Sequence, residues 1–133
     1  MVELRIDGYY LSEGRKWEDW HAGHKEEGYS YEFIKININN TFFSYIITDR
    51  NFNFIDFLKK YQTIKELQNK TSVNYGNIKI TNNKVQFSYI ALEEFPMHFE
   101  LEIISPELLK DKDGRKYHFV PVDEEKLKGL PEF

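Results

Sequence analysis

Alternation of apolar and polar residues is clearest between Tyr75 and Ile104, where it predicts three successive strands. Asn82-Asn83 separates the first two strands, and a two-residue turn there would pair Ile78 with Phe87. Asparagine tolerates a positive φ better than other residues that carry a side chain, so this dipeptide suits a hairpin turn. The third strand, Met97 to Ile103, alternates strictly. The stretch is therefore predicted to be an antiparallel meander with one buried face and one solvated face.

The same period of two predicts strands on both sides of this meander. Residues 2 to 11 alternate, with Tyr10 on the inward parity, and Gly8 is expected to mark a bend. Residues 107 to 110 are expected to form a short strand or a helical turn. Residues 115 to 122 are apolar on both faces and are predicted to be a last strand covered on both sides.

A second hairpin is predicted over residues 29 to 48, with its turn at Asn39-Asn40. A two-residue turn at this position would place Phe43 and Tyr45 on the inward parity, opposite a run of alternating isoleucines. These two aromatic residues are therefore expected to face the interior of the sheet.

A helical period replaces the strand period between the two hairpins. Phe54, Phe57 and Leu58 begin a series of apolar residues spaced by three and four, which predicts an amphipathic helix to about residue 68. Asn53 is expected to cap this helix, and the carboxylate of Asp56 suits the positive end of the helix dipole.

No apolar period is visible over residues 12 to 28, which are polar, charged and contain three glycines. We expect a long loop here, and loops of this length in a compact domain are often functional. The loop contains both tryptophans, Trp17 and Trp20. It is therefore predicted to act as a lid over one end of the sheet.

Seven or eight antiparallel strands joined by tight turns predict a mainly β fold. So many sequential strands close into a barrel, because closure removes the exposed edges. The alternative is an α+β open antiparallel sheet with the helix across one face. A chain of 133 residues is expected to form one domain over residues 1–133.

The order of these segments resembles the small lipocalin-like (calycin-like) barrels of bacteria. Gly8-Tyr9-Tyr10 stands where lipocalins carry Gly-x-Trp. The strand rhythm that carries the resemblance lies in residues 75–80, 82–87, 108–109 and 114–120. The resemblance spans most of the chain and implies an eight-stranded barrel with an apolar cavity.

Composition narrows the classes of partner. With 18 basic and 22 acidic residues the net charge is −4, which disfavours nucleic acid and anionic membranes. The chain has no cysteine, no basic and apolar leader and no apolar run long enough for a membrane span. We expect a cytoplasmic protein, and an exported bacterial domain is also compatible with these features.

Familiar catalytic motifs are absent from the sequence: there is no Gly-x-Ser-x-Gly elbow, no glycine-rich phosphate loop and no Gly-x-Gly-x-x-Gly. Glu93-Glu94 is interpreted as a solvated turn. His21 and His24 lie near carboxylates, but their spacing matches no closed metal motif and Gly23 argues against a rigid helix that would hold both rings. We therefore expect no cofactor and no metal, and an enzyme is the third hypothesis.

Ligand binding is the leading hypothesis, because an eight-stranded barrel holds either packed side chains or one small ligand. The ligand would be a small apolar or amphipathic molecule, since tyrosine hydroxyls would give an apolar cavity polar tips. The second hypothesis is a protein-interaction module, of the inhibitor or immunity type, with a closed core. The candidate ligand-binding residues are Tyr10, Trp17, Trp20, Phe43, Tyr45, Phe87, Tyr89 and Phe99.

Overall fold

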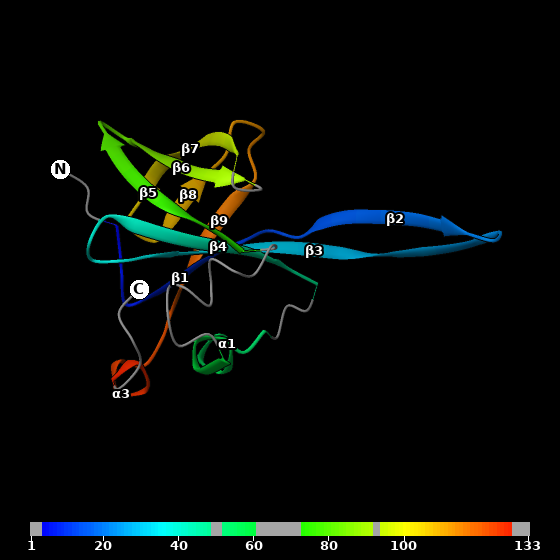
Figure 1. Cartoon of the computed structure of the whole chain (residues 1–133), viewed down its shortest axis with the longest axis horizontal. Helices are drawn as coiled ribbons and strands as arrows, with labels where there is room; N and C mark the ends of the chain where they lie inside the picture. The colour runs from blue at the N-terminus through cyan, green and yellow to red at the C-terminus, as the bar shows by residue number, and fades with distance from the viewer. Residues whose placement is uncertain (1–3, 49–51, 61–72, 92–93, 129–133) are drawn as a thin grey trace.

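Eight antiparallel strands close into a barrel (Figure 1). The computed structural model describes residues 4–48, 52–60, 73–91 and 94–128. Hydrogen-bonded neighbours follow the order β1-β9-β8-β7-β6-β5-β4-β3, and a pairing of β1 with β3 closes the ring. The barrel strands are β1 (Gly8–Ser12), β3 (His24–Ile36), β4 (Thr41–Ile47), β5 (Val73–Thr81), β6 (Lys84–Ala91), β7 (Phe95–Ser105), β8 (Leu108–Lys110) and β9 (Lys116–Pro121). Closure confirms the predicted barrel and excludes the open sheet.

A ninth strand, β2 (Arg15–His21), lies outside the ring. It pairs with residues 24–30 of β3, whereas residues 31–36 of the same strand belong to the barrel wall. The β2–β3 hairpin therefore projects from the barrel as a two-stranded ribbon, which Figure 1 shows on the right. The prediction of a loop over residues 12 to 28 is wrong.

The first two strands of the central meander have the predicted register. Ile78 lies opposite Phe87, and Phe87 lies opposite Phe99 on the next strand. Asn82 has a φ of 56°, which shows why asparagine suits this turn. The interior face of the meander therefore follows directly from its alternation.

The first hairpin has a longer turn than its Asn-Asn pair predicts. The amide of Asn37 donates to the carbonyl of Thr41 at 2.9 Å, so three residues separate this bonded pair. Asn40 has a φ of 60°, as expected for the last residue of a three-residue hairpin loop. This extra residue reverses the parity of β4 relative to the prediction. Phe42 consequently faces the interior, and Phe43 faces outward.

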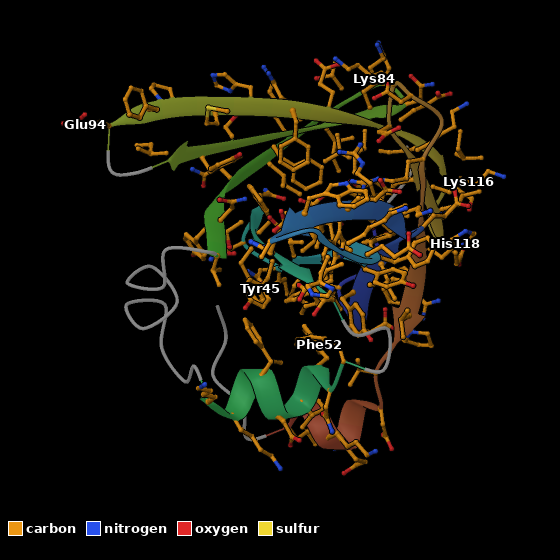
Figure 2. All side chains as sticks on the ribbon, turned by 90° about the vertical axis from the view of Figure 1, so that its right-hand side faces the viewer. Tyr45, Phe52, Lys84, Glu94, Lys116 and His118 are labelled. Carbon is orange, nitrogen blue, oxygen red and sulfur yellow. The ribbon has the colours of Figure 1, made fainter. Side chains whose placement is uncertain are left out.

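Two hydrophobic clusters lie on opposite sides of the barrel wall. The inner cluster draws on β1, β3, β4, β6, β7, β8 and β9, and therefore fills the barrel. The outer cluster combines β1, β3, β4 and β5 with the helix α1 (Phe54–Lys60). In Figure 2, Tyr45 and Phe52 lie between the barrel and α1. The helix is thus a layer on the outer wall.

Helix α1 begins as predicted. The amide of Asp56 donates to Oδ1 of Asn53 at 3.0 Å, which confirms the N-cap. Phe54, Phe57 and Leu58 are buried against the barrel. The predicted extension to residue 68 lies outside the described residues. A second, single-turn helix, α3 (Glu124–Leu127), follows β9.

Residues 2 to 7 were predicted to belong to the first strand. Of these, the structure describes residues 4 to 7, and they are not part of the strand, which begins at Gly8. This segment is held instead by Lys35, whose ammonium donates to the carbonyls of Ile6 at 2.6 Å and Ile36 at 2.9 Å. Lys35 is only 9% exposed. Burial lowers its pKa from 10.5 to about 8, and nearby Asp7 opposes part of that effect.

Candidate functional site

A two-residue turn makes the projecting hairpin possible. Ala22 and Gly23 have φ values of 49° and 82°, the positive values required by the turn that best matches the twist of a hairpin. The turn brings His21 opposite His24, and the pairing continues to Arg15 opposite Ser30. Both faces of the ribbon are polar, so the sequence lacks the one-sided apolar pattern by which the other strands were recognised.

One face of the hairpin carries a cross-strand network of four charges. Lys16 contacts Glu18 at 3.6 Å and Glu27 at 3.3 Å, and Lys25 contacts the same two carboxylates at 3.1 and 3.4 Å. Exposed ion pairs of this kind contribute little individually, but a network limits the movement of every member. The network therefore favours one geometry of the ribbon.

The two tryptophans lie on opposite faces of this ribbon. Trp17 covers Gly28, where an added Cβ would come within 2.9 Å of the indole ring, and it is 37% exposed. Trp20 lies on the same face as the charged network, opposite Lys25, and is 65% exposed. Neither ring belongs to a hydrophobic core cluster in the described part of the chain.

The Trp17 face also carries Asp19 opposite Glu26, next to the histidine pair. Nε2 of His21 lies 2.7 Å from Oδ2 of Asp19. Among the described residues, no three His, Asp or Glu side chains are arranged to hold a metal ion. The hairpin projects outward from the barrel in Figure 1, and its two strands replace the loop that was expected to act as a lid.

Aromatic side chains fill the barrel interior between β4, β6 and β7. The rings of Phe87 and Phe99 stack at 4.5 Å, and Phe42 packs against them edge-on at 4.9 and 6.1 Å. Tyr89 lies 6.2 Å from Phe99. Of the predicted ligand-binding residues, Tyr10, Phe87, Tyr89 and Phe99 thus face inward. Phe43 and Tyr45 pack under α1 instead, because of the longer first turn.

Protein groups bind the tyrosine hydroxyls that lie deepest in the interior. Tyr10 donates to the carbonyl of Pro106 at 2.7 Å. Tyr117 donates to the carboxylate of Glu32 at 2.7 Å and accepts from Arg115 at 2.7 Å. Burial, followed by the charge of Glu32, raises the pKa of Tyr117. These hydroxyls are satisfied within the fold and need no ligand.

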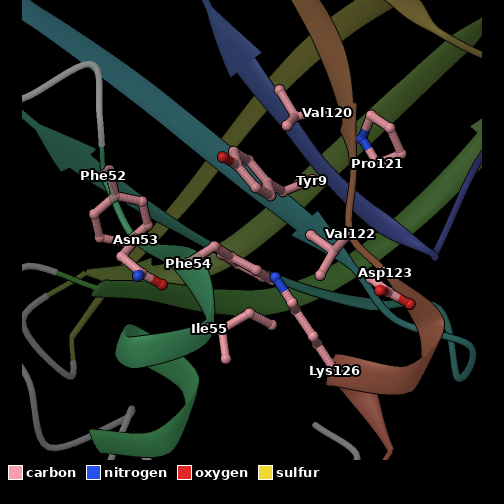
Figure 3. A pocket seen from close by; sticks show the side chains of 10 residues that line it. All are labelled: Tyr9, Phe52, Asn53, Phe54, Ile55, Val120, Pro121, Val122, Asp123 and Lys126. Carbon is pink, nitrogen blue, oxygen red and sulfur yellow. The ribbon is translucent and has the colours of Figure 1, made fainter.

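A shallow pocket of about 290 Å³ lies outside the barrel, between α1, α3 and the end of β9 (Figure 3). Phe52, Phe54 and Val120 give it an apolar wall. Tyr9 also lines it, and burial raises the pKa of this tyrosine. The remaining lining residues are Asn53, Ile55, Pro121, Val122, Asp123 and Lys126. This pocket could not be predicted from the sequence, because its residues come from three separate segments.

No protein-family model, curated protein or solved structure matches this chain. The closed antiparallel barrel agrees with the architecture that the lipocalin-like resemblance implies. No helix within the described residues has the length and apolar character needed to cross a membrane.

Proposed function

We propose that this protein is a protein-interaction module whose working face is the β2–β3 hairpin. The observation that carries this proposal is the exposure of Trp17 and Trp20 on a ribbon that stands clear of the barrel. Exposed Tyr29 adds a third aromatic side chain on the Trp20 face. Tryptophan and tyrosine are the residue types most often found as energetic anchors of interfaces.

The tryptophans and the charged residues of the hairpin have different roles in this proposal. Each indole offers a large apolar surface at low entropic cost to a pocket on a partner. The charges around it give specificity and increase the rate of association. An isolated two-stranded ribbon has little stability of its own. Burial of its faces by a partner would therefore also stabilise it.

A photo-cross-linking amino acid at position 20 tests the proposal in cells of the source organism. Position 90 is the matched control, because Trp20 and Ile90 are both 65% exposed and lie on different hairpins. We expect a defined protein adduct from position 20 that is absent from position 90. The adduct partner is then identified, purified and titrated. Equal cross-linking at both positions would contradict the proposal.

Affinity for the purified partner gives the quantitative test. Trp20→Ala should weaken binding by about 30-fold or more, the effect of losing an anchor worth about 2 kcal/mol. The exposed Ile80→Ala variant, on β5, serves as control and should leave affinity unchanged. If Trp17→Ala and Trp20→Ala both retain full affinity, the hairpin is not the working face.

A lipocalin-like barrel that binds a small apolar or amphipathic molecule is the second candidate function. The outer pocket of Figure 3 supports it, because an apolar wall there lies beside the hydroxyl of Tyr9. Native mass spectrometry of the purified protein should detect a bound small mass. Val120→Trp, which fills the pocket, should abolish that mass, whereas Ile80→Trp should not. Retention of the mass in Val120→Trp would exclude this pocket.

A further inference from the structure

Strand β2 presents an unpaired edge. Within the described residues it pairs with β3 alone. The pair beside a two-residue turn exchanges both hydrogen bonds, and bonded and non-bonded pairs then alternate along the ladder. Trp17 and Asp19 therefore direct their backbone groups at β3. Lys16, Glu18 and Trp20 direct theirs at the free edge, which can accept another strand.

The charged side chains along this edge are arranged around Trp17, with positive charge before it and negative charge after it. Residues 15 to 19 read Arg-Lys-Trp-Glu-Asp, so two cations precede Trp17 and two carboxylates follow it. An antiparallel copy of the same strand, aligned on Trp17, meets opposite charge at every charged position. Arg15 faces Asp19 of the second copy, and Lys16 faces Glu18 of the second copy.

We propose that two copies of this chain associate by antiparallel pairing of their β2 strands, centred on Trp17. The two-fold axis runs perpendicular to the sheet through the Trp17 pair, as a symmetric dimer requires. The Lys16–Glu18 pairs are the hydrogen-bonded pairs, which agrees with the direction of their backbone groups. The Trp17 pair is non-bonded, the type of pair in which side chains come closest.

In this arrangement each face of one ribbon also lies beside the same face of the second copy. Lys16 and Glu18 share a face with Lys25 and Glu27, so pairing joins two four-charge networks into one. Arg15 and Asp19 share the opposite face. Charge on an edge strand usually prevents association when it repels a second copy. Here every charged position is attracted by its counterpart, so the pattern selects self-pairing.

This inference rests on the proposed function, since it names the partner of the same hairpin as a second copy. The paired segment is short: the amide of Glu13, just before β2, already donates to the carbonyl of Lys116 at 2.8 Å. A short ladder between exposed strands buries less surface than a permanent dimer does. The dimer should therefore dissociate on dilution and weaken as salt screens its charges.

Two charge variants test the pairing. The acidic variant is Arg15→Glu with Lys16→Glu, and the basic variant is Glu18→Lys with Asp19→Lys. Sedimentation equilibrium should give wild-type protein a concentration-dependent mass that approaches twice the 16.0 kDa of one chain. Each variant alone should remain a monomer, because like charges then face each other. A one-to-one mixture should recover the doubled mass, because every facing pair is again opposite in charge.

The control variant is Lys79→Glu with Lys84→Glu, which changes the net charge as much as the acidic variant but lies on β5 and β6, neither of which pairs with β2. It should dimerise like wild type, and circular dichroism should show that all variants are folded. The pairing would be overturned if the acidic and the basic variant each formed dimers when measured alone. It would also be overturned if their one-to-one mixture remained monomeric. A wild-type monomer whose position 20 still cross-links to another protein would overturn self-pairing and leave the proposed function standing.

Discussion

The buried ammonium of Lys35 predicts a stability that rises with pH. The pKa of this group is 10.5 in an exposed chain and about 8 in the folded protein. A tenfold change in a protonation equilibrium corresponds to about 1.4 kcal/mol. The charged form therefore costs the folded state about 3 kcal/mol below pH 8, where both states are protonated. Between pH 8 and 10.5 the unfolded chain binds more protons, so the free energy of unfolding increases as pH rises.

Tyrosine ionisation sets the upper limit of the pH range in which the effect of Lys35 on stability can be measured. Burial raises the pKa of Tyr9, Tyr10 and Tyr117, so the folded state resists their ionisation and stability falls above about pH 10. From pH 7 to 9.5, Lys35 alone should contribute an increase of about 2 kcal/mol. With a urea dependence of about 2 kcal/mol per molar, the unfolding midpoint should move up by about 1 M.

Urea unfolding of Lys35→Met at several pH values checks this reasoning. The variant has no ammonium to deprotonate and should lose the increase. Lys84→Met is the control, because Lys84 is exposed and its removal should leave the slope intact. The stability of Lys35→Met at pH 7 is a separate quantity, because that variant also loses the bonds to the Ile6 and Ile36 carbonyls. A wild-type curve as flat as that of Lys35→Met would refute the assigned burial of the charge.

Three further predictions concern the packing of the barrel and its helix. Gly76→Ala should destabilise the protein by about 3 kcal/mol or more, because the new Cβ would lie 1.9 Å from the carbonyl oxygen of Ser88; thermal unfolding measures this, and a loss below about 1 kcal/mol would contradict it. Phe87→Ala should cost about 3–5 kcal/mol in urea unfolding, and a small cost would show that the barrel interior is loosely packed. Asn53→Ala should cost about 1 kcal/mol, and Asn53→Asp should restore most of it; equal stability of all three proteins would contradict the cap.

The sequence predicted strands wherever one face is apolar and the other polar. Residues 75 to 104 are the clearest case, since the pair Ile78–Phe87 follows from alternation and one short turn. The helix cap at Asn53 was also readable, because capping depends on neighbouring residues alone. Barrel closure followed from the number of strands and the avoidance of free edges.

The candidate site was less predictable, for two physical reasons. The hairpin has polar residues on both faces, so its strands lack the periodic signal that burial creates. Its register is set instead by the two-residue turn at Ala22 and Gly23, and its geometry by charges paired across strands. The inward face of β4 depended on one extra turn residue, and a shift by one residue moves every side chain to the other face. Phe43 and Tyr45 were misplaced for that reason.

The seam that closes the barrel has a mechanical consequence. The β1–β3 ladder contains two residue pairs, Tyr10 with Ile34 and Leu11 with Phe33, and the projecting hairpin is the continuation of the same β3 strand. A force applied at the hairpin tip is therefore transmitted along one unbroken strand to the shortest junction of the ring. We expect optical-tweezer experiments to show that pulling at the tip opens this seam first, at lower force than pulling across the β6–β7 ladder, where eight residue pairs share the load.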